Sequence, residues 1–196
     1  NSGIFSPKAL PEAFCSSPTQ PKDSQNLSLE KPSHKNNRGL PYVNQDITSE
    51  LKQRLTQFSS ISPTDYLFIV DINAQKNYLF YKNTLIDVFN VSTGSKTRYK
   101  GNRELPEAVW RLGNRIDKRR QPDLSAIYGA RLIYLEKYST TKKTFRQTVK
   151  AFHGTNEPHN IGKPTSMGCV YHYDDDIIAL YEFIPKHTLV ISVKNM

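Results

Sequence analysis

A histidine and a cysteine sixteen positions apart, His153 and Cys169, are the residues of this chain best suited to covalent chemistry. A thiol becomes a useful nucleophile when a nearby base or cation favours the thiolate, and when backbone amides can stabilise the charge on an attacked carbonyl. The segment between the two residues holds three glycines and two prolines, so it could fold back and bring them together. Gly168 would let the backbone turn tightly beside the sulfur. The pattern favours nucleophilic catalysis by Cys169.

Three other roles for Cys169 remain open. It could be a small buried apolar side chain, the usual role of a cysteine among apolar residues. It could pair with Cys15, because the chain has only two cysteines. It could also bind zinc with His153, His159 and His172, although only Cys169 and His172 are spaced as paired zinc ligands are. We expect no metal and no cofactor.

The residues around this pair predict a mainly β domain. Short runs rich in aromatic and β-branched residues are separated by turn residues, as in hairpins. These runs occupy 66–71, 78–81, 85–91, 107–113, 129–138, 145–154 and 187–193. A helix is predicted after the cysteine, from Asp174 to Ile184, with the acidic residues 174–176 as its cap and Pro185 as its end.

The N-terminal part differs from the rest in composition. Residues 1–45 hold six of the twelve prolines and little periodic apolar content, which indicates a tail or linker. Residues 46–62 contain apolar side chains at helical spacing and predict a short amphipathic helix with its connection. Residues 63–196 would then form the catalytic domain.

The positive charge is concentrated in one stretch. Residues 96–150 contain fifteen lysines and arginines and five acidic residues, a balance of +10 in a chain of net charge +9. Such a stretch could meet nucleic acid, anionic lipid or an acidic cell-wall polymer. The aromatic residues follow strand patterns that a core explains, so no nucleic-acid partner is expected. No apolar run approaches the roughly 20 residues that span a bilayer.

The segment AFHGTNEPHNIGKPTSMGC, followed by a helix, resembles the catalytic segment of the YkuD-type L,D-transpeptidases. In that family the segment usually reads His-Gly-Thr-Asn, a Gly/Pro loop, Ser-His-Gly-Cys and then Ile-Arg-Met. The segments VSTGSKT, LPEAVWRL and IYGARLIYLEKY are similar to further family motifs. The resemblance covers roughly residues 65–194.

The resemblance implies a β-sandwich or barrel with the cysteine at the floor of a groove. Such enzymes attack peptidoglycan stem peptides after an L-configured residue, form a thioester, and pass the acyl group to an amine or to water. Cys169 would be the nucleophile, His153 its base, and the Gly154 carbonyl would orient the imidazole. Backbone amides around Met167 and Gly168, with that of Cys169, would form the oxyanion hole.

The chain departs from the family pattern at two positions. Met167 replaces the usual histidine, and Tyr171 replaces a common arginine whose bidentate grip on a carboxylate tyrosine cannot reproduce. His172 or Arg131 could supply the missing cation, and Ser166 and Tyr171 are further expected substrate contacts. Transfer to an amine is the expected reaction. Transfer to water, or a decayed wall-binding module, are the alternatives.

The expected location is the periplasm or cell envelope. The chain begins with Asn1, which would fit a signal peptide that is absent from this sequence. Peptidoglycan stem peptides are the expected partners. The sequence does not indicate an oligomeric state.

Overall fold

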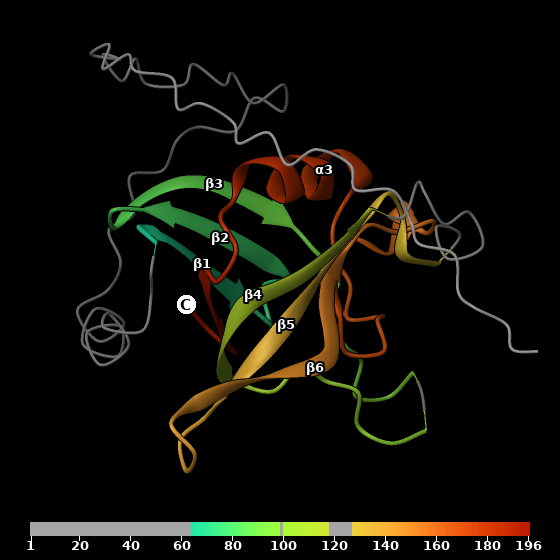
Figure 1. Cartoon of the computed structure of the whole chain (residues 1–196). Coiled ribbons are helices and arrows are strands. Elements are labelled where there is room, and N and C mark those ends of the chain that lie inside the picture. The colour runs from blue at the N-terminus through green and yellow to red at the C-terminus, as the bar shows by residue number, and fades with distance from the viewer. Residues whose placement is uncertain (1–63, 99, 118–126) are drawn as a thin grey trace, which may run out of the picture. The chain divides into compact units, whose positions relative to one another are not determined.

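The computed structural model describes residues 64–98, 100–117 and 127–196. The tail predicted for 1–45 and the short helix predicted within 46–62 lie outside the described residues. The described part contains eight strands and, between the last two of them along the chain, one α-helix of ten residues (Figure 1).

The strands form one sheet in the order β3-β2-β1-β8-β4-β5-β6-β7. Their bounds are β1 (Tyr66–Asp71), β2 (Lys76–Tyr81), β3 (Thr84–Asn90), β4 (Ala108–Asp117), β5 (Arg131–Ser139), β6 (Thr144–His153), β7 (Val170–Tyr171) and β8 (Leu189–Val193). Neighbouring strands are antiparallel except for two parallel pairs, β1 with β8 and β6 with β7. The second parallel pair brings the histidine and cysteine segments together.

The centre of the sheet is apolar on both faces. In β1 and β8 every residue except Tyr66 is buried, because alternate side chains enter two different clusters. One cluster, which includes Phe68 and Val190, packs beneath the helix; the other, which includes Ile69 and Ile191, lies on the opposite face. Burial on both sides makes these two strands a rigid support for the loops at their ends.

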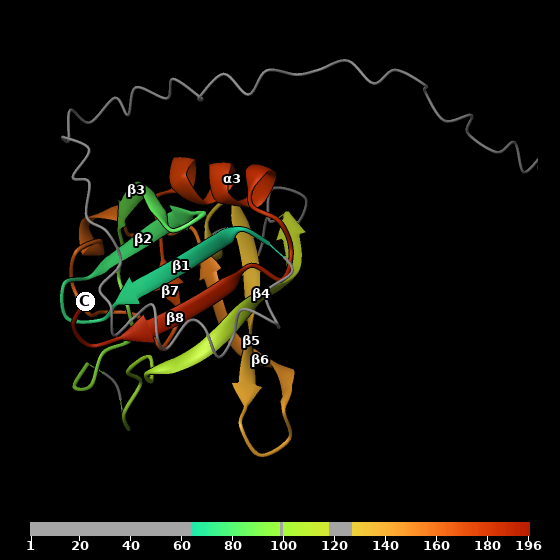
Figure 2. The ribbon, with the colours of Figure 1, turned by 90° about the vertical axis from the view of Figure 1, so that its left-hand side faces the viewer.

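Helix α3 (Asp174–Phe183) crosses one face of the sheet and contacts β5 and β6 (Figure 2). Ile177, Leu180 and Ile184 are buried in the cluster beneath it. Its bounds agree with the prediction from the apolar spacing and Pro185. Its start differs, because Tyr173 is the N-cap and no side chain caps the helix. The acidic residues 174–176 instead occupy the first turn, where the helix dipole favours negative charge.

The chain after β3 closes the sheet toward a barrel. Ser92 forms an antiparallel bridge with Tyr171, and Gly94 forms a parallel bridge with Ser166. The segment that follows one edge strand therefore pairs with the cysteine loop at the other edge. The mainly β fold with a helix after the cysteine is confirmed. In the described part of the chain no helix is long and apolar enough to cross a membrane.

Candidate active site

The two parallel strands β6 and β7 place the histidine and the cysteine on one face. Phe152 pairs with Val170 and His153 pairs with Tyr171. Phe152 and Val170 are fully buried in the core. Because side chains alternate along a strand, His153, Tyr171 and the preceding Cys169 project from the other face.

His153 is held in one orientation. Its ring is buried, and Nδ1 lies 2.6 Å from the carbonyl oxygen of Gly154. A carbonyl can only accept, so Nδ1 donates and the neutral ring carries its lone pair on Nε2. The ring packs against those of Tyr128 and Tyr171, with centroids 5.0 and 4.5 Å away. The tautomer is the one that a general base needs.

The loop that carries Gly154 is tied to the start of α3. Asp174 Oδ1 accepts the amides of Ala130 and Thr155, each at 3.2 Å. A Cβ at Gly154 would come within 1.9 Å of the same oxygen, and one at Gly129 within 2.1 Å. Asp174 therefore joins two loops beside His153 rather than capping the helix, a role that sequence reasoning missed.

Cys169 is half-buried, and its thiol lies over strand β6. Sγ is 3.8 Å from the carbonyl oxygen of Val149, to which it can donate. Burial raises the pKa of the Cys169 thiol, whereas the Ala151 backbone and the Lys150 charge lower it. Within residues 64–98, 100–117 and 127–196 Cys169 forms no disulfide, and it is the site's candidate nucleophile.

The cysteine loop is shaped by Ser166. Its buried hydroxyl donates to the carbonyl of Cys169 at 2.6 Å and accepts the amide of Gly168 at 3.0 Å. Gly168 has a φ of +109°, which favours glycine. Since the Gly168 amide already has a partner, it does not fit the oxyanion role expected for it. Ser166 was expected to contact the substrate, but its hydroxyl is hydrogen-bonded within the cysteine loop.

The segment after β3 holds the other side of this loop. Ser92 exchanges two backbone hydrogen bonds with Tyr171, and Ser166 is bonded to Thr93 and Ser95. A Cβ at Gly94 would lie 1.8 Å from the Arg103 carbonyl oxygen and 2.8 Å from the Cα of the loop glycine. Close backbone approach therefore requires glycine here.

The two side chains expected to supply a cation are both buried. His172 is 0% exposed, and its Nε2 lies 3.0 Å from Nδ2 of Asn77, so Nε2 accepts. Burial lowers the pKa of His172 to about 3, so the ring is neutral at neutral pH. Arg131 is 1% exposed and paired with Asp117 and Glu182, each at 3.0 Å. A substrate-binding role fits neither placement.

Exposed apolar side chains border the cysteine instead. Met167 is 56% exposed and Val149 is 90% exposed. Tyr171, the other departure from the family pattern, is half-buried against the His153 ring. Neither Met167 nor Tyr171 carries a positive charge.

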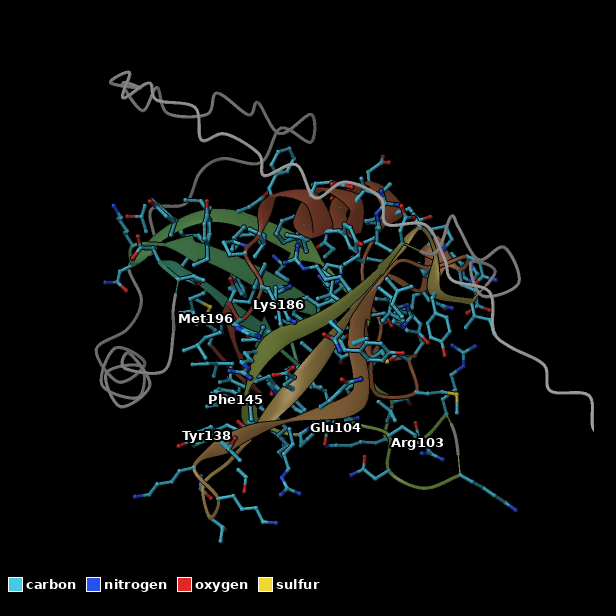
Figure 3. The ribbon with its side chains drawn as sticks, viewed as in Figure 1. Arg103, Glu104, Tyr138, Phe145, Lys186 and Met196 are labelled. Atoms are coloured by element: carbon cyan, nitrogen blue, oxygen red, sulfur yellow. The ribbon has the colours of Figure 1, made fainter. Side chains whose placement is uncertain are left out.

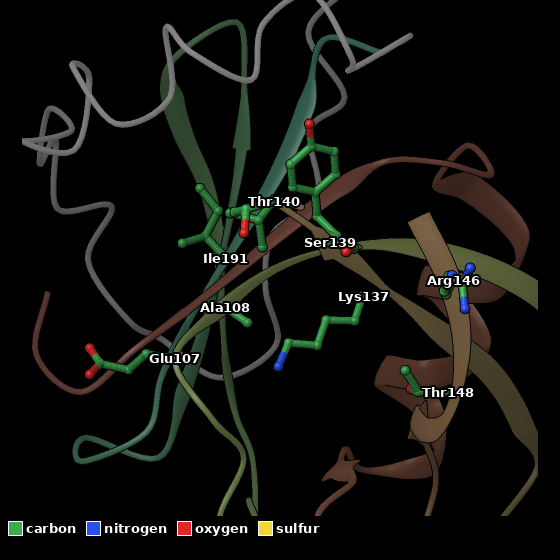
Figure 4. A pocket seen from close by; sticks show the side chains of 10 residues that line it. Glu107, Ala108, Lys137, Ser139, Thr140, Arg146, Thr148 and Ile191 are labelled. Carbon is green, nitrogen blue, oxygen red and sulfur yellow. The ribbon is translucent and has the colours of Figure 1, made fainter. Parts of the chain in front are cut away.

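Two further observations concern possible ligands. In the ranges 64–98, 100–117 and 127–196, no three His, Cys, Asp or Glu side chains gather as metal ligands, so the zinc hypothesis gains no support. A hollow of about 640 Å³ lies elsewhere, lined by residues of β4, β5 and β6, their connections and β8, such as Glu107, Lys137 and Ile191 (Figure 4). It contains none of the candidate catalytic residues.

Comparison with known proteins gives a consistent result. The family model of the YkuD L,D-transpeptidase catalytic domain matches residues 65–191. A Bacillus licheniformis protein named for the L,D-transpeptidase YkuD is 26% identical over 125 residues, which are 64% of this chain and 64% of that protein. The chain therefore spans a little under two thirds of this curated relative.

Among the solved structures, one supports the same fold. Bd1075 of Bdellovibrio bacteriovorus matches with a TM-score of 0.54 and 18% identity, over 80% of this chain and 54% of that one. An L,D-transpeptidase fragment from Xylanimonas cellulosilytica matches with a TM-score of 0.48 and 17% identity, over 75% of this chain and 71% of that one.

Proposed function

The chain belongs to the YkuD L,D-transpeptidase catalytic domain family, and on that premise we propose that it is a peptidoglycan-modifying cysteine enzyme. It attacks a stem peptide at the bond that follows an L-configured residue. Cys169 takes the acyl group as a thioester and an amine receives it. The proposed place of action is the cell envelope, where this substrate lies.

The observation that carries the proposal is the oriented histidine on the strand that pairs with β7, which begins directly after the cysteine. The Gly154 carbonyl fixes Nδ1–H at 2.6 Å, which leaves Nε2 to accept a proton. The parallel register pairs His153 with Tyr171, two residues after Cys169, and the alternation of side chains supports a position for both reacting groups on one face. A nucleophile, its base and a group that orients the base are the elements of nucleophilic acyl transfer.

The first half-reaction forms the thioester. His153 accepts the thiol proton, and the thiolate of Cys169 attacks the carbonyl carbon of the L,D peptide bond. The amides of Met167 and Cys169 stabilise the resulting oxyanion. When the tetrahedral intermediate collapses, the C–N bond breaks and the leaving amine takes the proton from His153.

The second half-reaction regenerates the enzyme. A neutral acceptor amine attacks the thioester carbonyl, and His153 accepts a proton from the attacking nitrogen. The C–S bond breaks, and the proton returns to the sulfur. Water in place of the amine would give hydrolysis by the same proton transfers.

Mass spectrometry of muropeptides tests this function. Purified protein is incubated with tetrapeptide muropeptides, with Cys169→Ala as the inactive control. A new cross-linked dimer, absent from the control, is the expected product. Conversion to tripeptide alone would make the protein a carboxypeptidase. Unchanged muropeptides, together with binding to peptidoglycan, would indicate a wall-binding module.

A further inference from the structure

Strand β6 is interrupted by a bulge next to the cysteine. Ala151 pairs with Tyr134 and Gln147 pairs with Glu136, so the three residues 148–150 face the single residue Leu135 of β5. The hydroxyl of Thr148 closes the bulge, since it donates to the Leu135 carbonyl at 2.7 Å and accepts the Lys150 amide at 3.1 Å. The bulge breaks the alternation of side chains where Lys150 emerges.

The ammonium of Lys150 reaches the cysteine loop. Nζ donates to the carbonyl oxygen of Gly168 at 3.2 Å, and a Cβ on that glycine would lie 2.3 Å from Nζ. The Cys169 sulfur lies over the same bulge, near the Val149 carbonyl and the Ala151 backbone. The ammonium thus sits beside the residue that precedes the nucleophile, and its strand neighbours contact the sulfur.

The two groups interact electrostatically. The Lys150 charge lowers the pKa of the Cys169 thiol, and the thiolate raises the pKa of Lys150 in return. Burial has the larger effect on each pKa and favours both neutral forms. The charges of two other cations lower the pKa of Lys150, namely Arg103 and, on β5, Lys137. Arg103 lies in the loop between β3 and β4 (Figure 3). His153 follows Ala151 by two residues on β6.

We propose that Lys150 is a positioning residue of the active site: its ammonium fixes the Gly168 carbonyl and stabilises the thiolate of Cys169. It provides, next to the sulfur, a positive charge that neither Met167 nor Tyr171 carries. Burial disfavours a bare thiolate, and the ammonium offsets part of that penalty. The proposal deepens the proposed function, because it concerns the same nucleophile.

Alkylation of Cys169 by iodoacetamide, a neutral probe, tests the proposal. Rates are measured across a pH series on the full chain, and peptide mapping separates Cys169 from Cys15. Lys150→Met should slow the reaction about tenfold at pH 7 and move its midpoint to higher pH, because an opposite charge beside the thiolate is lost. Lys150→Arg keeps the charge and should react within about twofold of the parent. Lys142→Met, on the exposed β5–β6 turn, is the matched control.

Two results would overturn the proposal for Lys150. An unchanged pH profile in Lys150→Met overturns the proposal. A shift in Lys150→Arg as large as the shift in Lys150→Met also overturns it, because charge would then not be the cause. Thermal unfolding of each variant detects loss of structure, and Lys150→Gln replaces the methionine variant where that one fails to fold. Alkylation needs no peptide substrate, so the result is independent of whether the muropeptide assay succeeds.

Discussion

The histidine side and the cysteine side of the site are built differently. His153 is buried, bonded to Gly154 and enclosed by two tyrosine rings. Cys169 is half-buried in a loop, with Met167 exposed beside it. The candidate base is thus fixed by the core of the fold, whereas the candidate nucleophile lies where side chains can change without disturbing that core. We therefore expect specificity for the acceptor to depend on the cysteine side.

The largest effect is expected from removal of the candidate base on the histidine side. His153→Ala should lower turnover of muropeptides about 10³-fold, within the range that general acid–base catalysis contributes. Product formation followed by mass spectrometry gives the rate. His159→Ala, which alters an exposed histidine of the intervening loop, is the control and should keep the parent rate. Equal rates in both variants would exclude His153 as the base.

The buried histidine next to the site should make the histidine side sensitive to acid. His172 has a pKa of about 3 in the folded protein against 6.5 as its ordinary value. The unfolded chain therefore binds a proton below pH 6.5 that the folded chain rejects until about pH 3. Between pH 7.5 and pH 5 this costs about 2 kcal/mol of unfolding free energy.

Denaturant titrations at the two pH values measure that loss. His172→Gln stays neutral and should reduce the difference, whereas His159→Gln should retain it. The same pH dependence in parent and His172→Gln would show that another group is responsible.

A smaller effect is expected at the link between helix and loop. Asp174→Ala removes the acceptor for the Ala130 and Thr155 amides and loosens the Gly154 carbonyl. Turnover should fall about fivefold, or about 1 kcal/mol, because only part of the roughly 1.5–3 kcal/mol of a hydrogen bond to a charged group is transmitted to the Gly154 carbonyl. Asp175→Ala keeps this link and lies in the same helical turn, so it controls for the helix dipole. Equal loss of kcat in both variants would point to the dipole instead.

The smallest effect is expected on the cysteine side. Met167→Ala should change the unfolding free energy by less than about 0.5 kcal/mol, because the side chain is 56% exposed. The rate of thioester formation should change by less than about threefold, since only the Met167 amide enters the chemistry. The ratio of cross-linked to hydrolysed product should change more. A marked loss of stability would show that Met167 packs in the core. The difference between the histidine side and the cysteine side would then not hold.

Local patterns predicted most of the elements. YLFIVD predicted β1 at its observed bounds, and the acidic start, apolar spacing and Pro185 predicted α3. His153 and Cys169 were found because their types and the Gly/Pro loop between them are local signals. The two-residue β7 was missed, since a strand so short has no periodicity.

Features that depend on distant contacts were not predicted. The bulge at residues 148–150 exists only in the pairing with β5, so no local pattern predicts that Lys150 reaches Gly168. The bonds from Asp174 to two loops, and the burial of Arg131 and His172, likewise arise from packing. Sequence analysis therefore named the candidate reacting groups and the Gly154 carbonyl, but not the contacts that Asp174 and Lys150 make with the surrounding loops.

Acylation by a carbapenem tests directly whether Cys169 is the nucleophile. The intact protein is incubated with the drug under reducing conditions and its mass is measured, and peptide mapping locates the adduct. We expect the mass of one drug molecule to be added to each chain, on Cys169, and no added mass in Cys169→Ala. An unmodified protein, or an adduct on Cys15 alone, would contradict it.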